Sequence, residues 1–201
     1  MEKRKLQEFK KLLINVDMVN GFVREGLMAD SYIEHIIPEQ IRLINLILGE
    51  NEALAFIKDC HKLGCKEFDR YPAHCVEGTI EAELVNELKP YEKEALVYKK
   101  NSTSAIFAPN FTNDIKKMKS LREVIITGCC TDICDMNLAI PLQNYFDQNN
   151  QRVEIIIPMN AVETYNAPNH NRDEYNNMAF KFIEQSGIQL VKKYGGNNYG
   201  K

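Results

Sequence analysis

Residues 124–134 read Val124-Ile125-Ile126-Thr127-Gly128-Cys129-Cys130-Thr131-Asp132-Ile133-Cys134, and they join an apolar run to a turn of small residues. The run is typical of a strand buried on both faces. The turn delivers Cys134 to the first turn of a following helix, where partial positive charge favours an ionised thiol. Unpaired N–H groups at the same helix end can hold an oxyanion. This stretch therefore predicts a strand–turn–helix unit that presents a candidate nucleophile.

Outward from this unit, short apolar runs alternate with helical patterns along the whole chain. The expected strands cover residues 12–16, 53–57, 95–98, 123–127, 153–157 and 188–191. The expected helices cover residues 32–48 (interrupted near Pro38), 81–88, 112–119, 132–148 (with Pro141 inside) and 173–185. Continuous apolar strands separated by helices indicate a mostly parallel sheet covered on both faces. We therefore predict a single-domain, three-layer α/β/α fold of Rossmann-like type over residues 1–193, followed by a flexible tail over residues 194–201.

Bulk composition narrows the class of protein. The chain has 201 residues, of which 44% are hydrophobic and 26% charged, as expected for one globular domain with a full core. A net charge of −3 gives no electrostatic case for binding nucleic acid or an anionic membrane. No apolar run reaches membrane-spanning length, and the charged N-terminus is unlike a secretory signal. The six cysteines are then expected to be reduced thiols in a cytoplasmic protein.

Four reactive side chains follow expected strands, namely Asp17, Asp59, Lys100 and Cys134. Parallel sheets carry their sites at the carboxyl ends of the strands. A strand-end Asp or Lys taken singly is usually solvated, and a lone cysteine is usually an inert buried thiol. Taken together, Asp17 is a candidate acceptor for the Cys134 proton, and Lys100 is a candidate for stabilising the thiolate.

A candidate metal site follows the second strand. Asp59 and His61 are two residues apart, so an extended chain presents both on one side, and His74 follows in an irregular segment. Such ligands suit Zn²⁺, Fe²⁺ or Mn²⁺ and leave open coordination positions. A competing interpretation is a closed structural zinc site built from Cys60, Cys65, Cys75 and His61, which we consider less favoured because no second close cysteine pair follows.

Three segments resemble the isochorismatase-like cysteine hydrolases, a resemblance that extends from about residue 12 to residue 183. They are Asp17-Met18-Val19-Asn20-Gly21-Phe22, Lys100 with Ser104-Ala105 and Phe107, and Gly128–Cys134. The resemblance implies that Asp17 is the catalytic base, that Lys100 completes the triad and that Cys134 is the nucleophile. It further implies a cis peptide bond between Cys129 and Cys130, and an oxyanion hole formed by the backbone N–H groups of Cys130 and Cys134.

Within that superfamily, the segment Tyr71-Pro72-Ala73-His74-Cys75-Val76-Glu77-Gly78-Thr79, with Ala82-Glu83-Leu84, is similar to nicotinamidases. This resemblance implies one divalent metal ion held by Asp59, His61 and His74. Zn²⁺ is the expected metal, with Fe²⁺ and Mn²⁺ as alternatives. Glu67 falls where a fourth ligand is found in some members. Rings that pack against the substrate are implied at Phe22, Tyr71 and Phe107.

The expected activity is hydrolysis of nicotinamide to nicotinate and ammonia, which returns nicotinamide towards NAD, and members of the family often form homo-oligomers. Val19, Gly21 and Asp135 depart from the family pattern, and we expect the Asp135 carboxylate to face away from the thiol. The alternatives are a hydrolase of another small amide or of isochorismate, a non-catalytic binding protein, and a thiol redox protein that uses Cys129, Cys130 and Cys134.

Overall fold

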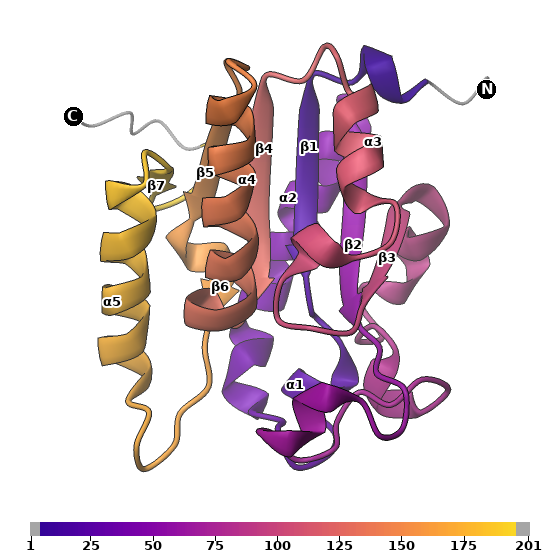
Figure 1. The fold of residues 1–201 in the computed structure, drawn as a ribbon, viewed down its shortest axis with the longest axis vertical. Helices are drawn as coiled ribbons and strands as arrows, with labels where there is room; N and C mark the ends of the chain where they lie inside the picture. The colour runs from indigo at the N-terminus through magenta and orange to yellow at the C-terminus, as the bar shows by residue number, and fades with distance from the viewer. Residues whose placement is uncertain (1–4, 196–201) are drawn as a thin grey trace.

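The computed structural model describes residues 5–195, and within them seven strands form one sheet in which all strand pairs are parallel (Figure 1). The order across the sheet is β3-β2-β1-β4-β5-β7, with β6 paired to β4. The strands are β1 (Lys11–Val16), β2 (Ala53–Asp59), β3 (Leu96–Lys100), β4 (Glu123–Cys129), β5 (Glu154–Pro158), β6 (Val162–Glu163) and β7 (Gln189–Val191). All six expected strands are present, and only the two-residue β6 was missed.

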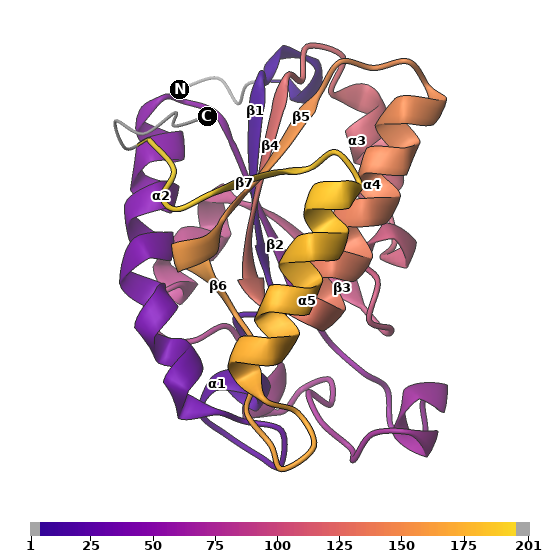
Figure 2. The same cartoon turned by 90° about the vertical axis from the view of Figure 1, so that its left-hand side faces the viewer.

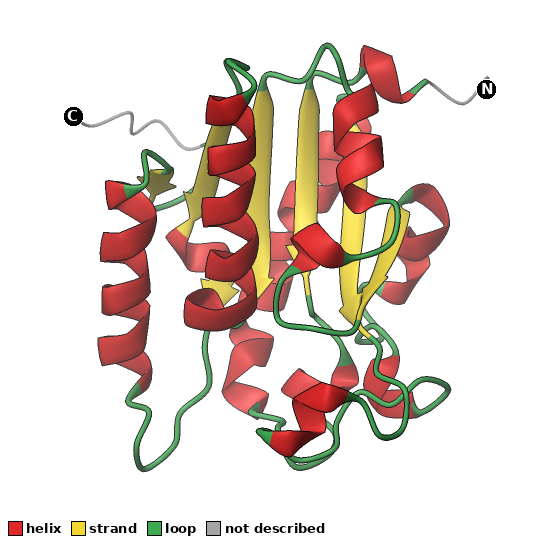
Figure 3. Cartoon of the chain, viewed as in Figure 1, coloured by secondary structure: helices red, strands yellow, loops and turns green. Residues whose placement is uncertain are grey.

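Helices cover both faces of the sheet, which confirms the predicted three-layer α/β/α fold (Figures 2 and 3). The α-helices are α1 (Asn20–Val23), α2 (Ile37–Gly49), α3 (Phe111–Lys117), α4 (Met136–Gln148) and α5 (Arg172–Gln185). The short helical turns are η1 (Leu6–Glu8), η2 (Ser31–Ile36), η3 (Lys66–Asp69), η4 (Ile80–Ala82), η5 (Lys89–Glu94), η6 (Ala105–Phe107), η7 (Thr131–Asp135, of π type) and η8 (Met159–Ala161). One apolar core lies under α2, and a second lies under α3, α4 and α5. None of the helices within residues 5–195 has the length and apolar character needed to cross a bilayer.

The two prolines that interrupt helical patterns have different effects. Pro38 lies at the start of α2, so the expected break falls between η2 and α2. Pro141 lies inside α4, which continues through it. Because Pro141 has no N–H, the carbonyl four residues earlier, that of Asn137, loses its helical donor. The hydroxyl of Ser104 donates to this carbonyl at 2.7 Å instead.

Two expectations about local structure were wrong. The helix predicted over residues 81–88 is reduced to the single turn η4, because the backbone there bonds to the segment after β1: Asn20 N–H donates to the Glu83 carbonyl, and Val85 N–H donates to the Met18 carbonyl. The flexible tail was predicted to begin at residue 194, yet Tyr194 is buried and its carbonyl accepts a hydrogen bond from Arg42. Residues 196–201 of that tail lie outside the described residues.

Candidate active site

The four strand-end side chains identified in the sequence come from four adjacent strands and meet at one edge of the sheet. Asp17 follows β1, Asp59 ends β2, Lys100 ends β3, and Cys134 lies in η7 directly after β4. Because the sheet order is β3-β2-β1-β4, the parallel carboxyl ends bring these groups together. All four side chains are almost completely buried.

Lys100 is the centre of this cluster. Its Nζ lies 2.8 Å from Oδ2 of Asp17, 2.7 Å from Oδ1 of Asp59 and 3.6 Å from Sγ of Cys134. A buried ammonium is tolerated only where anions compensate it. Two carboxylates do so here, and although burial lowers the pKa of Lys100, the two carboxylates and the neighbouring thiol raise it well above the ordinary value. Lys100 is therefore a permanent cation beside the thiol.

Asp17 has the properties of a proton acceptor. Its backbone has a φ of 52°, a left-handed conformation that turns the chain sharply out of β1. Burial raises the pKa of its carboxyl to about 6, against the opposing effect of the Lys100 ammonium. A carboxylate with a raised pKa is a stronger base than an ordinary aspartate and is still ionised at neutral pH.

The resting form of Cys134 differs from the expectation. A position at the helix start predicts a lowered thiol pKa, but burial raises the pKa of Cys134 well above its usual value, and Asp17 and Asp59 add to this against the effect of Lys100. The neutral thiol is thus the resting form, and a base must remove its proton during the reaction. The peptide bond between Cys129 and Cys130 is cis, as the resemblance implied.

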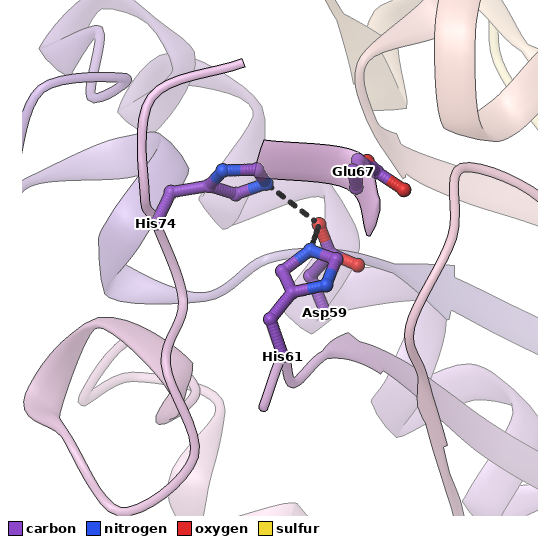
Figure 4. Close-up of side chains that lie close together, drawn as sticks. All are labelled: Asp59, His61, Glu67 and His74. Carbon is purple, nitrogen blue, oxygen red and sulfur yellow. Dashed lines mark ion pairs between the residues drawn. The ribbon is translucent and has the colours of Figure 1, made fainter. Parts of the chain in front are cut away.

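Asp59, His61, Glu67 and His74 form a compact cluster beside the triad (Figure 4). One ligand atom from each residue lies within 4.8 Å of the others, and all four side chains are buried. Figure 4 shows both imidazoles directed at the Asp59 carboxylate, with Nε2 of His61 at 3.1 Å and Nε2 of His74 at 3.4 Å from Oδ2.

The chemistry of this cluster fits a divalent metal ion. Oε2 of Glu67 is buried with no hydrogen-bond partner, and Nε2 of His61 has no partner besides the Asp59 carboxylate, an arrangement that is costly unless a cation or water engages these atoms. The second nitrogen of each ring, Nδ1, contacts a group outside the cluster. Nδ1 of His61 lies 3.0 Å from Oδ1 of Asn101, and Nδ1 of His74 lies 2.7 Å from the Pro72 carbonyl. Such outer partners fix the rings so that Nε2 is free to bind a metal.

The alternative cysteine site is not formed. Within residues 5–195, the cluster of potential metal ligands contains no cysteine. Cys75 is buried in the apolar core under α2, and Cys65 only approaches Nδ1 of His61, at 3.5 Å.

A pocket of about 770 Å³ opens onto both centres. Cys130 and Cys134 line it on the triad side, and Asp59, Glu67 and His74 line it on the other side. Phe22 and Tyr71 line it as expected. Phe107 does not, because its side chain is 79% exposed and lies outside the pocket lining, so the expected third ring is wrong in its placement.

No sequence pattern pointed to a third part of the pocket wall. Tyr32, Tyr165 and Arg172 line it, from the turn η2 and from the segment after β6. A search for loops that follow strand carboxyl ends would have included residues 164–171, had the short strand β6 been recognised.

Asp135, whose carboxylate we expect to face away from the thiol, is not exposed to solvent. It is fully buried, and neither carboxylate oxygen has a hydrogen-bond partner. It shares the buried side of the helix with Leu138, Ala139 and Leu142, which belong to the core under α4. Burial, reinforced by the charge of Asp17, raises the pKa of Asp135 well above its usual value, so it is held as the neutral acid.

Comparison with known proteins identifies the family. Residues 11–190 match the Isochorismatase domain. The chain belongs to this family. Its curated relatives include Nicotinamidase 1 of Arabidopsis thaliana, which is 34% identical over 137 residues, covering 61% of this chain and 55% of the relative. The match thus spans little more than half the length of that relative.

Solved structures of the isochorismatase family share the fold. Nicotinamidase PncA from Bacillus subtilis is 26% identical, with a TM-score of 0.76, over 91% of this chain and 99% of that one. The pyrazinamidase of Pyrococcus horikoshii, solved in complex with zinc, is 22% identical, with a TM-score of 0.74, over 90% of this chain and 98% of that one.

Proposed function

We propose that this isochorismatase-family protein is a metal-containing amidohydrolase that converts nicotinamide and water to nicotinate and ammonia. The observation that carries the proposal is the shared pocket, which is lined by Cys134 and by three members of the metal cluster, Asp59, Glu67 and His74. A thiol supplies covalent acyl transfer, and the cluster supplies an anchor for an aromatic nitrogen. In a cell, the reaction would return nicotinamide towards NAD.

In the proposed mechanism, the Asp17 carboxylate takes the proton of the Cys134 thiol. The resulting thiolate, stabilised by the Lys100 ammonium 3.6 Å from Sγ, attacks the carboxamide carbon. The C–N bond then breaks, and Asp17 returns its proton to the departing nitrogen as ammonia leaves. Water cleaves the thioester, releasing the carboxylic acid and restoring the thiol.

Charge on the carbonyl oxygen needs donors in the turn between β4 and α4. The N–H groups of Ile133 and Asp135 are already used, because both donate to the Cys130 carbonyl. We assign the oxyanion to the backbone N–H groups of Cys130 and Cys134, two residues that line the pocket. Each donor of this kind contributes about 3 kcal/mol to transition-state stabilisation.

Asp59, His61, Glu67 and His74 would hold the metal ion. A bound divalent cation would supply a Lewis acid that ligates the pyridine nitrogen or a water molecule. Zn²⁺ is our first choice because two imidazoles and two carboxylates suit it, with Fe²⁺ and Mn²⁺ as alternatives. Phe22 and Tyr71 would pack against the ring of the substrate.

Ammonia release tests the proposal. The purified protein, with its metal content measured, is assayed on nicotinamide and a panel of other small amides, next to Cys134→Ala. Nicotinamide should be the best substrate, and Cys134→Ala should release no ammonia while its circular dichroism stays native. Preference for another amide would overturn the substrate, and full activity of Cys134→Ala would overturn the mechanism. Inactivity of the metal-loaded protein on every amide would favour a non-catalytic binding protein.

A further inference from the structure

One part of the pocket wall is built from two segments that are far apart in sequence. One is the loop and turn around Asp30 and Tyr32, and the other covers residues 164–172, from the end of β6 to the first residue of α5. Figure 2 shows this second segment as the orange loop at the base of α5, beside the purple chain that precedes α2.

The segment over residues 164–172 is fixed to the catalytic turn at one point. Both oxygens of the Asp132 carboxylate are used: Oδ1 accepts from the Thr164 hydroxyl, and Oδ2 lies 2.9 Å from Nε2 of His170. The His170 ring also stacks on Tyr165, with centroids 3.9 Å apart and planes 10° apart. These contacts hold the Tyr165 side of the wall next to the turn that carries Cys134.

The same segment is also held by the carboxylate of Asp30, a residue that lines this wall. Oδ2 of Asp30 accepts from the Asn166 N–H at 3.0 Å and from the Arg172 guanidinium, while Oδ1 accepts from the Tyr32 N–H at 3.0 Å. The Asp30 backbone N–H donates to the carbonyl of Phe22, a residue of the pocket. Asp30 thus ties three pocket-lining residues, through its carboxylate, to the element that carries Phe22, which its backbone contacts.

Arg172 strengthens this junction. Its Nε donates to the Thr164 carbonyl at 3.0 Å, and its Cζ lies 3.9 Å from the centre of the Tyr32 ring. The guanidinium is therefore held by a carboxylate, a carbonyl and an aromatic face that belong to both segments. Because these contacts already fix the planar guanidinium, Arg172 loses little further conformational entropy when a ligand binds.

We propose that Asp30 is a positioning residue that determines substrate selectivity, because it closes the pocket by clamping residues 164–172 over the bound amide. The pocket, about 770 Å³, is large for a single aromatic ring, so retention of a small ring depends on the position of this wall. Release of the clamp widens the pocket, which weakens binding of small amides and favours bulky ones. The effect on selectivity rests on the proposed amidohydrolase function, whereas the clamp itself does not.

The test compares Asp30→Ala with Glu87→Ala. Glu87 forms a two-point ion pair with Arg24, at 2.9 and 2.8 Å, in the same region, but neither residue lines the pocket. For Asp30→Ala, we expect KM for nicotinamide to rise about tenfold with little change in kcat, as expected when binding geometry alone is loosened. The ratio of kcat/KM for nicotinamide to that for quinoline-3-carboxamide should fall by a similar factor. Glu87→Ala should keep the wild-type ratio, and Asp30→Glu should recover part of it.

Hydrogen exchange gives a readout that needs no substrate. Asp30→Ala should accelerate exchange in residues 164–172 and leave the catalytic turn over residues 128–136 protected, whereas Glu87→Ala should leave both unchanged. Arg172→Ala should accelerate exchange in the same segment, because it removes the ion pair with Asp30 together with the hydrogen bond to the Thr164 carbonyl. Unchanged exchange and an unchanged substrate ratio in Asp30→Ala would overturn the inference. A wild-type protein inactive on all amides would overturn the proposed function, and hydrogen exchange would still decide whether the clamp exists.

Discussion

Lys100 Nζ and Asp59 Oδ1 lie 2.7 Å apart, and this pair joins the triad to the candidate metal cluster. The second oxygen of Asp59 faces Nε2 of His61 and Nε2 of His74. Although burial raises the pKa of Asp59, the Lys100 ammonium and the two imidazoles hold it below its usual range. One carboxylate is thus shared by the two halves of the site and stays ionised.

This shared role distinguishes Asp59 from Asp17. We expect Asp59→Asn to lower metal affinity by at least about 100-fold, because loss of an outer-shell partner alone costs up to about 100-fold and Asp59 is itself a charged ligand of the cluster. It should also leave Lys100 with a single carboxylate partner. Asp17→Asn, the matched control, should retain metal and lose activity. Metal analysis after dialysis, together with ammonia release, measures both; equal metal content in the two variants would contradict the assignment of Asp59 as a ligand.

The pH profile should have an acid limb set by Asp17. The carboxylate accepts the thiol proton only when ionised, and burial raises its pKa to about 6. Protonation as pH falls through this value removes the base, so kcat/KM should decline below about pH 6 and stay high above it. The assay covers pH 4.5 to 8, with circular dichroism at each pH to confirm that the protein stays folded. A flat profile between pH 7 and pH 5 would rule out Asp17 as the base.

The strands and the reactive side chains at their ends could be predicted from sequence, because both follow from local patterns. The apolar runs place Asp17, Lys100 and Cys134 at carboxyl ends, and a parallel sheet then brings them together. The state of the Cys134 thiol could not be predicted, since it depends on burial by distant segments. The same holds for Phe107, which is exposed although its sequence position suggested a pocket wall. The clamp at Asp30 depends on contacts between segments more than 130 residues apart, which no local pattern encodes.

At Gly128, the backbone conformation and a close neighbour exclude any side chain. Its φ is +136°, and a Cβ at this position would lie 2.0 Å from the Val16 carbonyl oxygen, directly before Asp17. Gly128→Ala should therefore reduce the free energy of unfolding by about 3 kcal/mol or more and displace the base. Urea denaturation measures the first effect and ammonia release the second.

Gly49→Ala is the control for Gly128→Ala. Gly49 belongs to α2, and a Cβ there would have no neighbour within 4 Å. The Gly49→Ala change should leave activity intact and stabilise the protein by up to about 1 kcal/mol, since alanine restricts the unfolded chain. If Gly128→Ala were as stable and active as Gly49→Ala, the close approach of β4 to β1 at this point would be disproved.

Asp135 should make the protein less stable as pH rises. Its pKa in the folded protein is raised by burial, whereas in the unfolded chain it is about 4. The folded state therefore holds the proton more tightly, so the stability present below about pH 4 is progressively lost at higher pH. Asp135→Asn removes the ionisable group at nearly constant size. We expect it to raise the free energy of unfolding by about 1 to 3 kcal/mol at pH 8, the range for relieving an unfavourable buried polar group. At pH 4.5 the gain should be much smaller.

Asp147→Asn, which changes an exposed carboxylate of α4, the helix that follows Asp135, is the control for this effect. Urea denaturation of the wild type and both variants at the two pH values measures it. Asp147→Asn should follow the wild type at both pH values, because an exposed carboxylate keeps its solvent on folding. A gain for Asp135→Asn that is equal at pH 4.5 and pH 8 would mean that the carboxyl group is not being held neutral by the core. A loss of stability at pH 8 would mean that the ionised carboxylate is compensated within the fold.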